Sequence, residues 1–193
     1  MITIIKDLLT RNRSYRIFDE SSEIDCETLR DFIELARLTS SRGNRQPLKY
    51  MLSCNKETNE KVFRNIFWAK QLKNWAGHQK GEKPTAYIIV LGDTTISKEF
   101  AFDTGLACQS ILIGAVEAGY GGCMINNINR ELLRKDFDID NIFEIMIVLA
   151  LGKPKQESII EKIGSDGSLS YWFDDENNNH VPKRSLDELI LRT

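Results

Sequence analysis

Two arginines three residues apart are the first side chains in this 193-residue chain whose spacing could do chemistry. Arg13 and Arg16 flank Ser14 in the stretch NRSYRIF, and a tight turn would let both guanidinium groups reach one anion. Guanidinium groups form planar, charge-assisted hydrogen bonds that suit a phosphate or a carbonyl that gains negative charge. Taken alone, the stretch could also be two solvated arginines that follow an amphipathic helix.

A second polar set lies in the stretch SSRGNRQPLKY. Ser41, Asn44 and Gln46 offer donors and acceptors of the kind that can bind the edge of a heterocycle. Gly43 permits an unusual backbone turn, and Pro47 is expected to hold Gln46 in an extended conformation. The alternative is a polar helix-to-strand loop whose side chains bond only to their own backbone.

A third set consists of two adjacent cations near the C-terminus, Lys183 and Arg184 in the stretch HVPKRSLDELI. Together they could hold a dianionic phosphate. Each attraction is about 4 kcal/mol at a separation of about 4 Å in an effective dielectric near 20, before desolvation is subtracted. An exposed basic tail is the alternative interpretation.

No pattern for nucleophilic or metal chemistry accompanies these sets. His78 lies in a polar segment and His180 in a stretch that resembles a turn, so we expect both at the surface. The sequence thus offers no protein residue for covalent catalysis and no metal-ligand set. Such a chain is most easily explained if a bound cofactor carries the chemistry.

Composition narrows the classes of partner. The formal net charge is only −2, from 26 basic and 28 acidic residues, so no global field would recruit nucleic acid or a membrane surface. The most apolar long window is interrupted by Gln109, Ser110 and Glu117, which argues against a bilayer span, and the N-terminal stretch does not resemble a signal peptide. We therefore expect a cytoplasmic protein. Its four cysteines form no C-x-x-C pair and are expected to be reduced, structural thiols: Cys26, Cys54, Cys108 and Cys123.

Apolar periodicity predicts the elements that must position the three polar sets. Helices are expected around residues 4–9, 25–38, 62–67, 97–118 and 130–137, with Asp25 and Asn129 as N-caps and Gly119 as a C-terminal cap. Strands are expected at residues 50–53, 86–92, 121–125 and 143–152, and an aromatic strand with an Asn-rich turn at 171–183. The alternation is irregular, and no G-x-G-x-x-G or P-loop pattern is present, so we predict a single α+β domain with a helix-wrapped sheet.

Taken in order, five blocks resemble the FMN-dependent nitroreductase family: NRSYRIF, ARLTSSRGNRQPLKY, DTGLACQSILIGAVEAGYGGCMI, VLALGKP and VPKRSLDELI. The resemblance covers nearly the whole chain. It departs from the family's usual pattern at Asn12, where Arg is frequent, at Ser40, where Pro is frequent, and at Met124, where an aromatic residue is usual.

The resemblance implies an α+β fold with a central, mostly antiparallel sheet wrapped by helices, in an intertwined homodimer. The whole chain, residues 1–193, would form a single nitroreductase-like domain, with residues from about 155 to 193 as an extended C-terminal arm over the partner. FMN would lie at the subunit interface, with NADH or NADPH as reductant and a small molecule as electron acceptor.

By the same resemblance, the cofactor-binding residues fall into four groups. The groups are Arg13, Ser14 and Arg16; Ser41, Asn44 and Gln46, which would contact the flavin of the other subunit; Gly121, Gly122 and Cys123; and Lys183 with Arg184 at the phosphate. The segment 64–83, with Trp68 and Trp75, would cover the site or anchor a loop on the core.

The implied activity is NAD(P)H-dependent reduction of nitroaromatic compounds, quinones or related electron-poor substrates, by ping-pong hydride transfer through flavin N5. A relative that performs reductive dehalogenation or flavin breakdown is an alternative that would share the cofactor residues. A flavin-binding redox sensor with little turnover is a second alternative.

Overall fold

The computed structural model describes residues 3–69, 72 and 75–192. A main sheet of five strands forms its centre, and all the strand pairs in it are antiparallel. Its order is β1-β5-β3-β2, and β4 also pairs with β5. The strands are β1 (Phe18–Asp19), β2 (Leu48–Ser53), β3 (Ala86–Asp93), β4 (Gly121–Ile125) and β5 (Phe143–Pro154).

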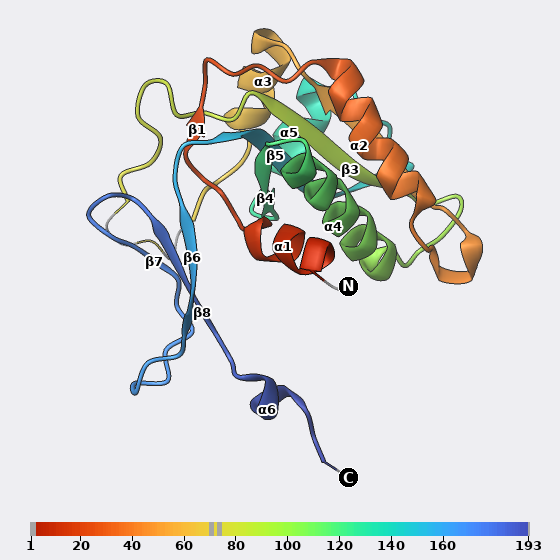
Figure 1. Ribbon diagram of the computed structural model, residues 1–193. Coiled ribbons are helices and arrows are strands. Elements are labelled where there is room, and N and C mark those ends of the chain that lie inside the picture. The colour runs from red at the N-terminus through yellow and green to blue at the C-terminus, as the bar shows by residue number, and fades with distance from the viewer. Residues whose placement is uncertain (1–2, 70–71, 73–74, 193) are drawn as a thin grey trace.

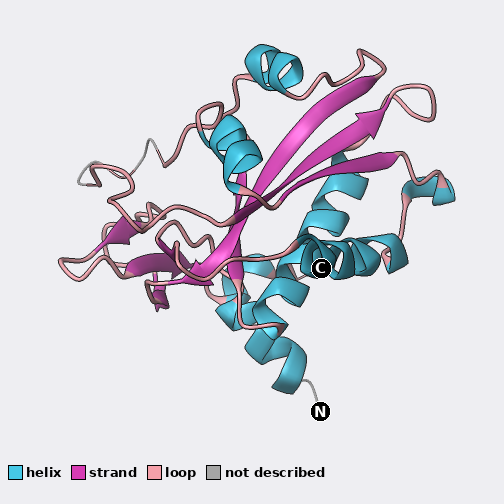
Figure 2. Cartoon of the chain, turned by 90° about the horizontal axis from the view of Figure 1, so that it is seen from above, coloured by secondary structure: helices cyan, strands magenta, loops and turns pink. Residues whose placement is uncertain are grey.

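Helices cover both faces of this sheet (Figures 1 and 2). They are α1 (Thr3–Arg11), α2 (Cys26–Leu38), α3 (Lys56–Phe63), α4 (Ala101–Glu117) and α5 (Arg130–Asp136). Every residue of β3 is buried, and its side chains alternate between two apolar clusters. Ile88 and Val90 pack with α2 and α4, whereas Ile89 and Leu91 pack with α3 and α5. This two-core arrangement explains why AYIIVLG is apolar at every position, and it confirms the predicted α+β fold.

The predicted helix caps are present. Asp25 accepts a hydrogen bond from the backbone N of Thr28 at 2.7 Å, and Asn129 accepts one from the backbone N of Leu132 at 3.2 Å. Gly119 has φ +83°, the left-handed conformation that favours glycine after a helix end. These local rules set where α2, α4 and α5 begin or end.

Other predicted boundaries were wrong. Helix α3 ends at Phe63, so Ile66 and Phe67 lie beyond it, and α4 begins at Ala101 rather than at residue 97. Asn65 and Ile66 instead form turn hydrogen bonds back to Val62 and Phe63, and Ile66 then bridges to Ile128. Tertiary pairing therefore stops the helix before its apolar pattern ends.

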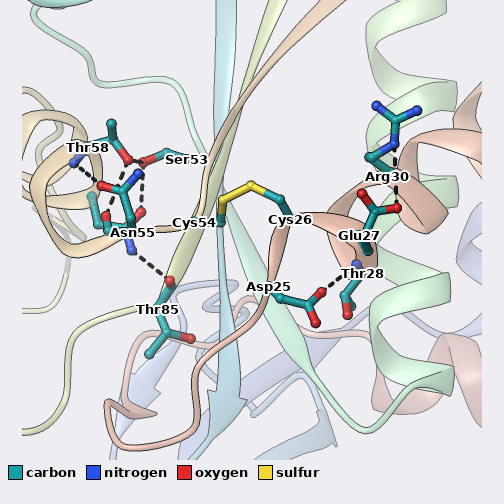
Figure 3. Close-up of a disulfide and its surroundings, with 11 residues drawn as sticks. Asp25, Cys26, Glu27, Thr28, Arg30, Ser53, Cys54, Asn55, Thr58 and Thr85 are labelled. Carbon is teal, nitrogen blue, oxygen red and sulfur yellow. Dashed lines mark hydrogen bonds and ion pairs between the residues drawn. A yellow bond between two sulfur atoms is a disulfide. The ribbon is translucent and has the colours of Figure 1, made fainter.

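The expectation of four reduced thiols is wrong for two of them, because Cys26 and Cys54 form a disulfide (Figure 3). Cys26 is the first residue of α2 and Cys54 follows the last residue of β2. The chain runs along α2, turns, and returns along β2, which brings the two Cα atoms to 5.6 Å, within the range that a disulfide requires. Cys108 and Cys123 remain free and buried.

Residues 155–192, here called the C-terminal segment, form a second sheet of three strands and a short helix. The elements are β6 (Ser158–Lys162), β7 (Trp172–Phe173), β8 (Asn179–Lys183) and α6 (Leu186–Leu189). β7 and β8 pair antiparallel on either side of the expected Asn-rich turn, whereas β6, which pairs in parallel with β8, was not predicted. Figure 1 shows this sheet beside the main body, with the chain end leading away from it.

The part of the chain that the structure describes contains no candidate for a membrane-spanning helix. None of the helices there combines the length and the apolar character needed to cross a bilayer.

Candidate functional site

A hollow of 250 Å³ lies where the loop after α1 meets β4, α4 and the C-terminal segment. It brings together residues from sets that are far apart in the sequence. The lining residues are Asn12, Arg13, Ser14, Arg16, Gln109, Leu112, Gly122, Met124, Tyr171, Asn179, Val181 and Lys183. We call this space the cationic hollow, because its lining includes three cations and no carboxylate among the residues that the structure describes.

Backbone pairing holds the Arg13–Arg16 loop against the glycine-rich strand β4. The backbone N of Tyr15 donates to the carbonyl of Gly122 at 3.0 Å, and Ser14 forms an isolated parallel bridge with Gly122. A side chain at Gly122 would have no room, since its Cβ would lie 2.7 Å from the carbonyl oxygen of Ala150. Glycine is therefore required where β4 packs against β5 and the side chain of Leu112.

Gly121 and Cys123 have other roles in this structure. A Cβ at Gly121 would meet the ring of Tyr15 and the side chain of Pro154, so this position is also closed to side chains. Cys123 is buried in the cluster that contains α3 and α5, and burial raises the pKa of its thiol, with Arg16 opposing the shift. Neither residue lines the cationic hollow.

Arg16 is held in place from several sides. Its side chain is 7% exposed, donates through Nη1 to the carbonyl of Ser14 at 2.9 Å, and lies 4.5 Å from the centroid of the Tyr171 ring. Its backbone N donates to Oε1 of Gln156 at 2.6 Å. The buried Gln156, which the sequence analysis did not single out, thus ties the Arg16 loop to the C-terminal segment.

Arg13 has hydrogen-bonding capacity that the described residues leave unmet. Its Nη2 donates to the carbonyl of Leu9 at 2.6 Å, but its buried Nε has no partner there. Burial lowers the pKa of Arg13, with a small opposing effect from Tyr15. Arg13 remains a cation, and an anionic ligand would compensate its desolvation.

The two C-terminal cations lie in different surroundings. Lys183 lines the cationic hollow, whereas Arg184 is exposed and lies 3.4 Å from Glu188 within the capping box of α6. Strand alternation explains the difference, because Asn179, Val181 and Lys183 share one face of β8 and Arg184 follows the strand.

Ser41 and Gln46 lie at a different place in the same chain. They line a separate hollow of 520 Å³ between α2, β2 and α4, which shares no lining residue with the cationic hollow. Asn44 lies outside its lining and bonds instead to Gln46, whose Nε2 donates to Asn44 Oδ1 at 3.1 Å. One chain therefore does not bring this polar set to Arg13 and Arg16.

The loop that carries this set has a strained backbone. Gly43, Asn44 and Gln46 have φ of 59°, 52° and 51°, so the expectation that Pro47 keeps Gln46 extended was wrong. The backbone N of Gln46 donates to Oγ of Ser41 at 2.8 Å, which holds it in the left-handed conformation. Two non-glycine residues with positive φ in one short loop are a feature that recurs at ligand-binding sites.

Both histidines were wrongly expected at the surface. His78 packs among Phe63, Trp68 and Trp75, with ring centroids 5.3, 4.5 and 5.1 Å away. Trp75 also lies 5.9 Å from Phe173, so this aromatic cluster touches β7. Residues 70, 71, 73 and 74 of the expected cover lie outside the described part of the chain.

His180 lies on β8 rather than in a turn. Its two ring nitrogens lie 3.1 Å from Glu161 Oε2 and 3.3 Å from Asp174 Oδ2, and Trp172 stacks on it at 4.0 Å. These contacts join β6, β7 and β8 outside the cationic hollow.

The chain is similar to several known proteins. An archaeal relative from Archaeoglobus fulgidus, named "Putative NADH dehydrogenase/NAD(P)H nitroreductase", is 27% identical over 161 residues, covering 79% of this chain and 86% of the relative. A solved nitroreductase-like protein from Streptococcus mutans covers 100% of both chains at 18% identity with a TM-score of 0.72. An FMN-dependent nitroreductase from Clostridium difficile covers 78% of this chain and 87% of its own at 18% identity, with a TM-score of 0.61.

These likenesses confirm the fold that the five sequence blocks predicted. The sequence model of the Nitroreductase family matches residues 9–153, which include β1 to β5 and the loop that carries Arg13 and Arg16. On that match, the chain belongs to the Nitroreductase family of oxidoreductases.

Proposed function

We propose that this protein is an FMN-dependent oxidoreductase that uses NADH or NADPH to reduce nitroaromatic compounds, quinones or related electron-poor molecules. The observation that carries the proposal is the cationic hollow, which joins Arg13, Arg16 and Lys183 without a carboxylate among the described lining residues. Family membership supports the redox class, and the names of two relatives give the nicotinamide reductant and the flavin.

The residues of the hollow fit a flavin mononucleotide. A phosphate needs cations and N–H donors, which Arg13 and Lys183 provide, and the unpaired Nε of Arg13 is a buried donor without a protein acceptor among the described residues. A flat ring can lie against backbone, and Gly122 contributes only backbone atoms to the lining. Ser14 adds an exposed hydroxyl at the same edge.

Arg16 is the residue proposed to tune the redox chemistry. When bound, FMN would supply hydride transfer at N5 and hold two electrons, with negative charge at its N1–C2 carbonyl edge. A buried guanidinium that is fixed by Ser14 and Tyr171 would stabilise that charge without reorganising. About 1.4 kcal/mol of such differential stabilisation corresponds to roughly 30 mV in a two-electron potential.

We propose further that the site is completed in a homodimer. Ser41, Asn44 and Gln46 lie apart from the cationic hollow within one chain, so a second copy would have to supply them. Arg184, Gly121 and Cys123, although outside the lining, are proposed to support the phosphate and ring through their neighbours in sequence. The chain would form one domain, with residues from about 155 to 193 acting as an arm over the partner and segment 64–83 as a cover that excludes water.

A flavin spectrum tests the proposal directly. Purified protein, reconstituted with FMN if necessary, should show an oxidised-flavin absorption band that NADH or NADPH bleaches without air and that a quinone restores. Protein that stays colourless after reconstitution would overturn it.

Arg16 offers the sharper test. Arg16→Met keeps apolar bulk but removes the charge, and should weaken FMN affinity by about 10- to 100-fold, the effect of losing one charged hydrogen bond. Arg16→Lys should recover part of this loss. Lys61→Met is a matched control, because Lys61 on α3 pairs with Glu57 and lines neither hollow.

A further inference from the structure

Asn179 is the most deeply buried polar residue of the cationic hollow. It begins β8, is 1% exposed and lines the hollow. Its backbone N donates to the carbonyl of Glu157 at 2.9 Å, and its side-chain Nδ2 lies 3.3 Å from Oγ of Ser158. The side chain is therefore fixed by β6, the neighbouring strand.

The hydrogen bonds of Ser158 determine which end of the amide faces the hollow. Its Oγ donates to the backbone carbonyl of Asn179 at 3.3 Å, so this oxygen is left as an acceptor toward the amide. The amide must then present Nδ2 to Ser158 and point Oδ1 away from it. Oδ1 is buried and has no hydrogen-bond partner among the described residues.

The unpaired Oδ1 of Asn179 is suited to accept a hydrogen bond from a ligand. Buried side-chain acceptors in folded proteins nearly always have a partner. The charged groups of the hollow, on Arg13, Arg16 and Lys183, are donors only, so an anion that bonded to all of them would still leave Oδ1 unmet. A ligand suited to the hollow needs acceptors for the cations and one N–H or O–H for Asn179.

The pyrimidine edge of oxidised flavin has this pattern, since two carbonyl oxygens flank the imide N3–H. The position of Asn179 agrees with it. Gln156 accepts a hydrogen bond from the backbone N of Arg16, and the next residue, Glu157, accepts one from the backbone N of Asn179. Arg16 and Asn179 therefore lie at the same end of the hollow. Lys183 is four residues along β8, about 13 Å away for an extended strand.

We propose that Asn179 accepts the N3–H of the flavin, beside the carbonyl edge assigned to Arg16, and so selects a ring with an imide proton. This inference rests on the proposed function. Because Oδ1 is buried, the lining of the hollow has to shift slightly for the ring to reach it.

A methylated cofactor separates this role from a structural one. In 3-methyl-FMN a methyl group replaces the N3 proton of FMN, so this position can no longer donate a hydrogen bond. Titration of the apoprotein, followed by quenching of flavin fluorescence, should show that the wild type binds FMN about 2- to 12-fold more tightly than 3-methyl-FMN, the effect of one neutral hydrogen bond. In Asn179→Leu, which keeps the branched shape of the side chain but removes its acceptor, most of this preference should disappear.

Asn141→Leu is the matched control, because Asn141 is exposed and distant in sequence from every lining residue. Equal binding of both flavins by the wild type would overturn the inference even if Asn179→Leu failed to fold. An undiminished preference in a folded Asn179→Leu would also overturn it. Either result would leave the proposed function standing, whereas a wild type that binds no FMN at all would overturn both.

Discussion

His78 shows how a single residue can depart from its expected role. The sequence around it is polar, yet its ring is surrounded by Phe63, Trp68 and Trp75. Burial lowers the pKa of His78 from 6.5 to about 4, and a backbone contact with Arg16 opposes the shift. The imidazole is therefore neutral in the folded protein at neutral pH.

This shift makes stability depend on pH. Between pH 6.5 and about 4 the unfolded chain binds a proton at His78 that the folded chain does not, so stability is complete above pH 6.5 and falls as the pH drops toward 4. Solvent screening at a half-buried site limits the loss to roughly 1–2 kcal/mol.

Urea unfolding at several pH values measures the effect. His78→Phe keeps an aromatic ring and has no group to protonate, so its stability should fall less than that of the wild type over the same interval. Parallel pH profiles for the two proteins would contradict the assignment.

Single residues also differ in whether the sequence could predict their place in the site. Arg13, Arg16 and Lys183 could be predicted to share a site because their charges and the family pattern both indicate it. Asn179 could not, since it ends an Asn-rich stretch that is typical of a turn. Its burial depends on pairing with Ser158 in a strand that has only a weak apolar pattern.

At the scale of elements, the disulfide joins the two ends of a helix–loop–strand unit. It links Cys26 and Cys54 across a sequence separation of 28, and the unit between them carries the loop with Ser41 and Gln46 at its far end. Closing a loop of this length stabilises the fold by about 3–4 kcal/mol in the chain-entropy model.

We therefore predict that Cys26→Ser/Cys54→Ser lowers the free energy of unfolding by about 3 kcal/mol. Denaturant titration without reductant measures this loss. Dithiothreitol should lower the stability of the wild type toward the same value and leave the double variant unchanged, which serves as the control. Equal stability of the oxidised wild type and the variant would refute the prediction.

The elements themselves differ in how far the sequence specifies them. The strands β3 and β5 could be predicted because long apolar runs must be buried on both sides. The disulfide could not, because its pairing requires α2 and β2 to return antiparallel, which no local pattern encodes. The helix end at Phe63 was missed for a similar reason, since the bridge from Ile66 to Ile128 is a tertiary contact.

At the scale of the whole molecule, several large apolar side chains are exposed to solvent in the single chain. Ile4 and Ile5 on α1 are 75% and 62% exposed, Phe102 on α4 is 71% exposed, and Leu191 beyond α6 is 89% exposed. No residue of α1 is buried although its apolar residues recur at helical spacing. These surfaces favour the proposed second copy as their partner.

Mixed dimers would test whether two chains share each site. Arg16→Met and Gln46→Ala alter different hollows, so a dimer with one chain of each kind would contain one intact site and one doubly altered site. Random pairing after co-expression should restore about a quarter of all sites to wild-type FMN affinity. Mixtures that bind no better than the separate variants would show that each chain builds its site alone.

The disulfide also turns residues 26–54 into a covalent ring. Arg42 and Arg45 are exposed within it, in the loop between α2 and β2. A protease that cuts after either one opens the ring but releases no fragment, because the two pieces stay joined through sulfur. On a gel such nicked protein would migrate as one chain until a thiol is added, so the loop could be cleaved without the molecule coming apart.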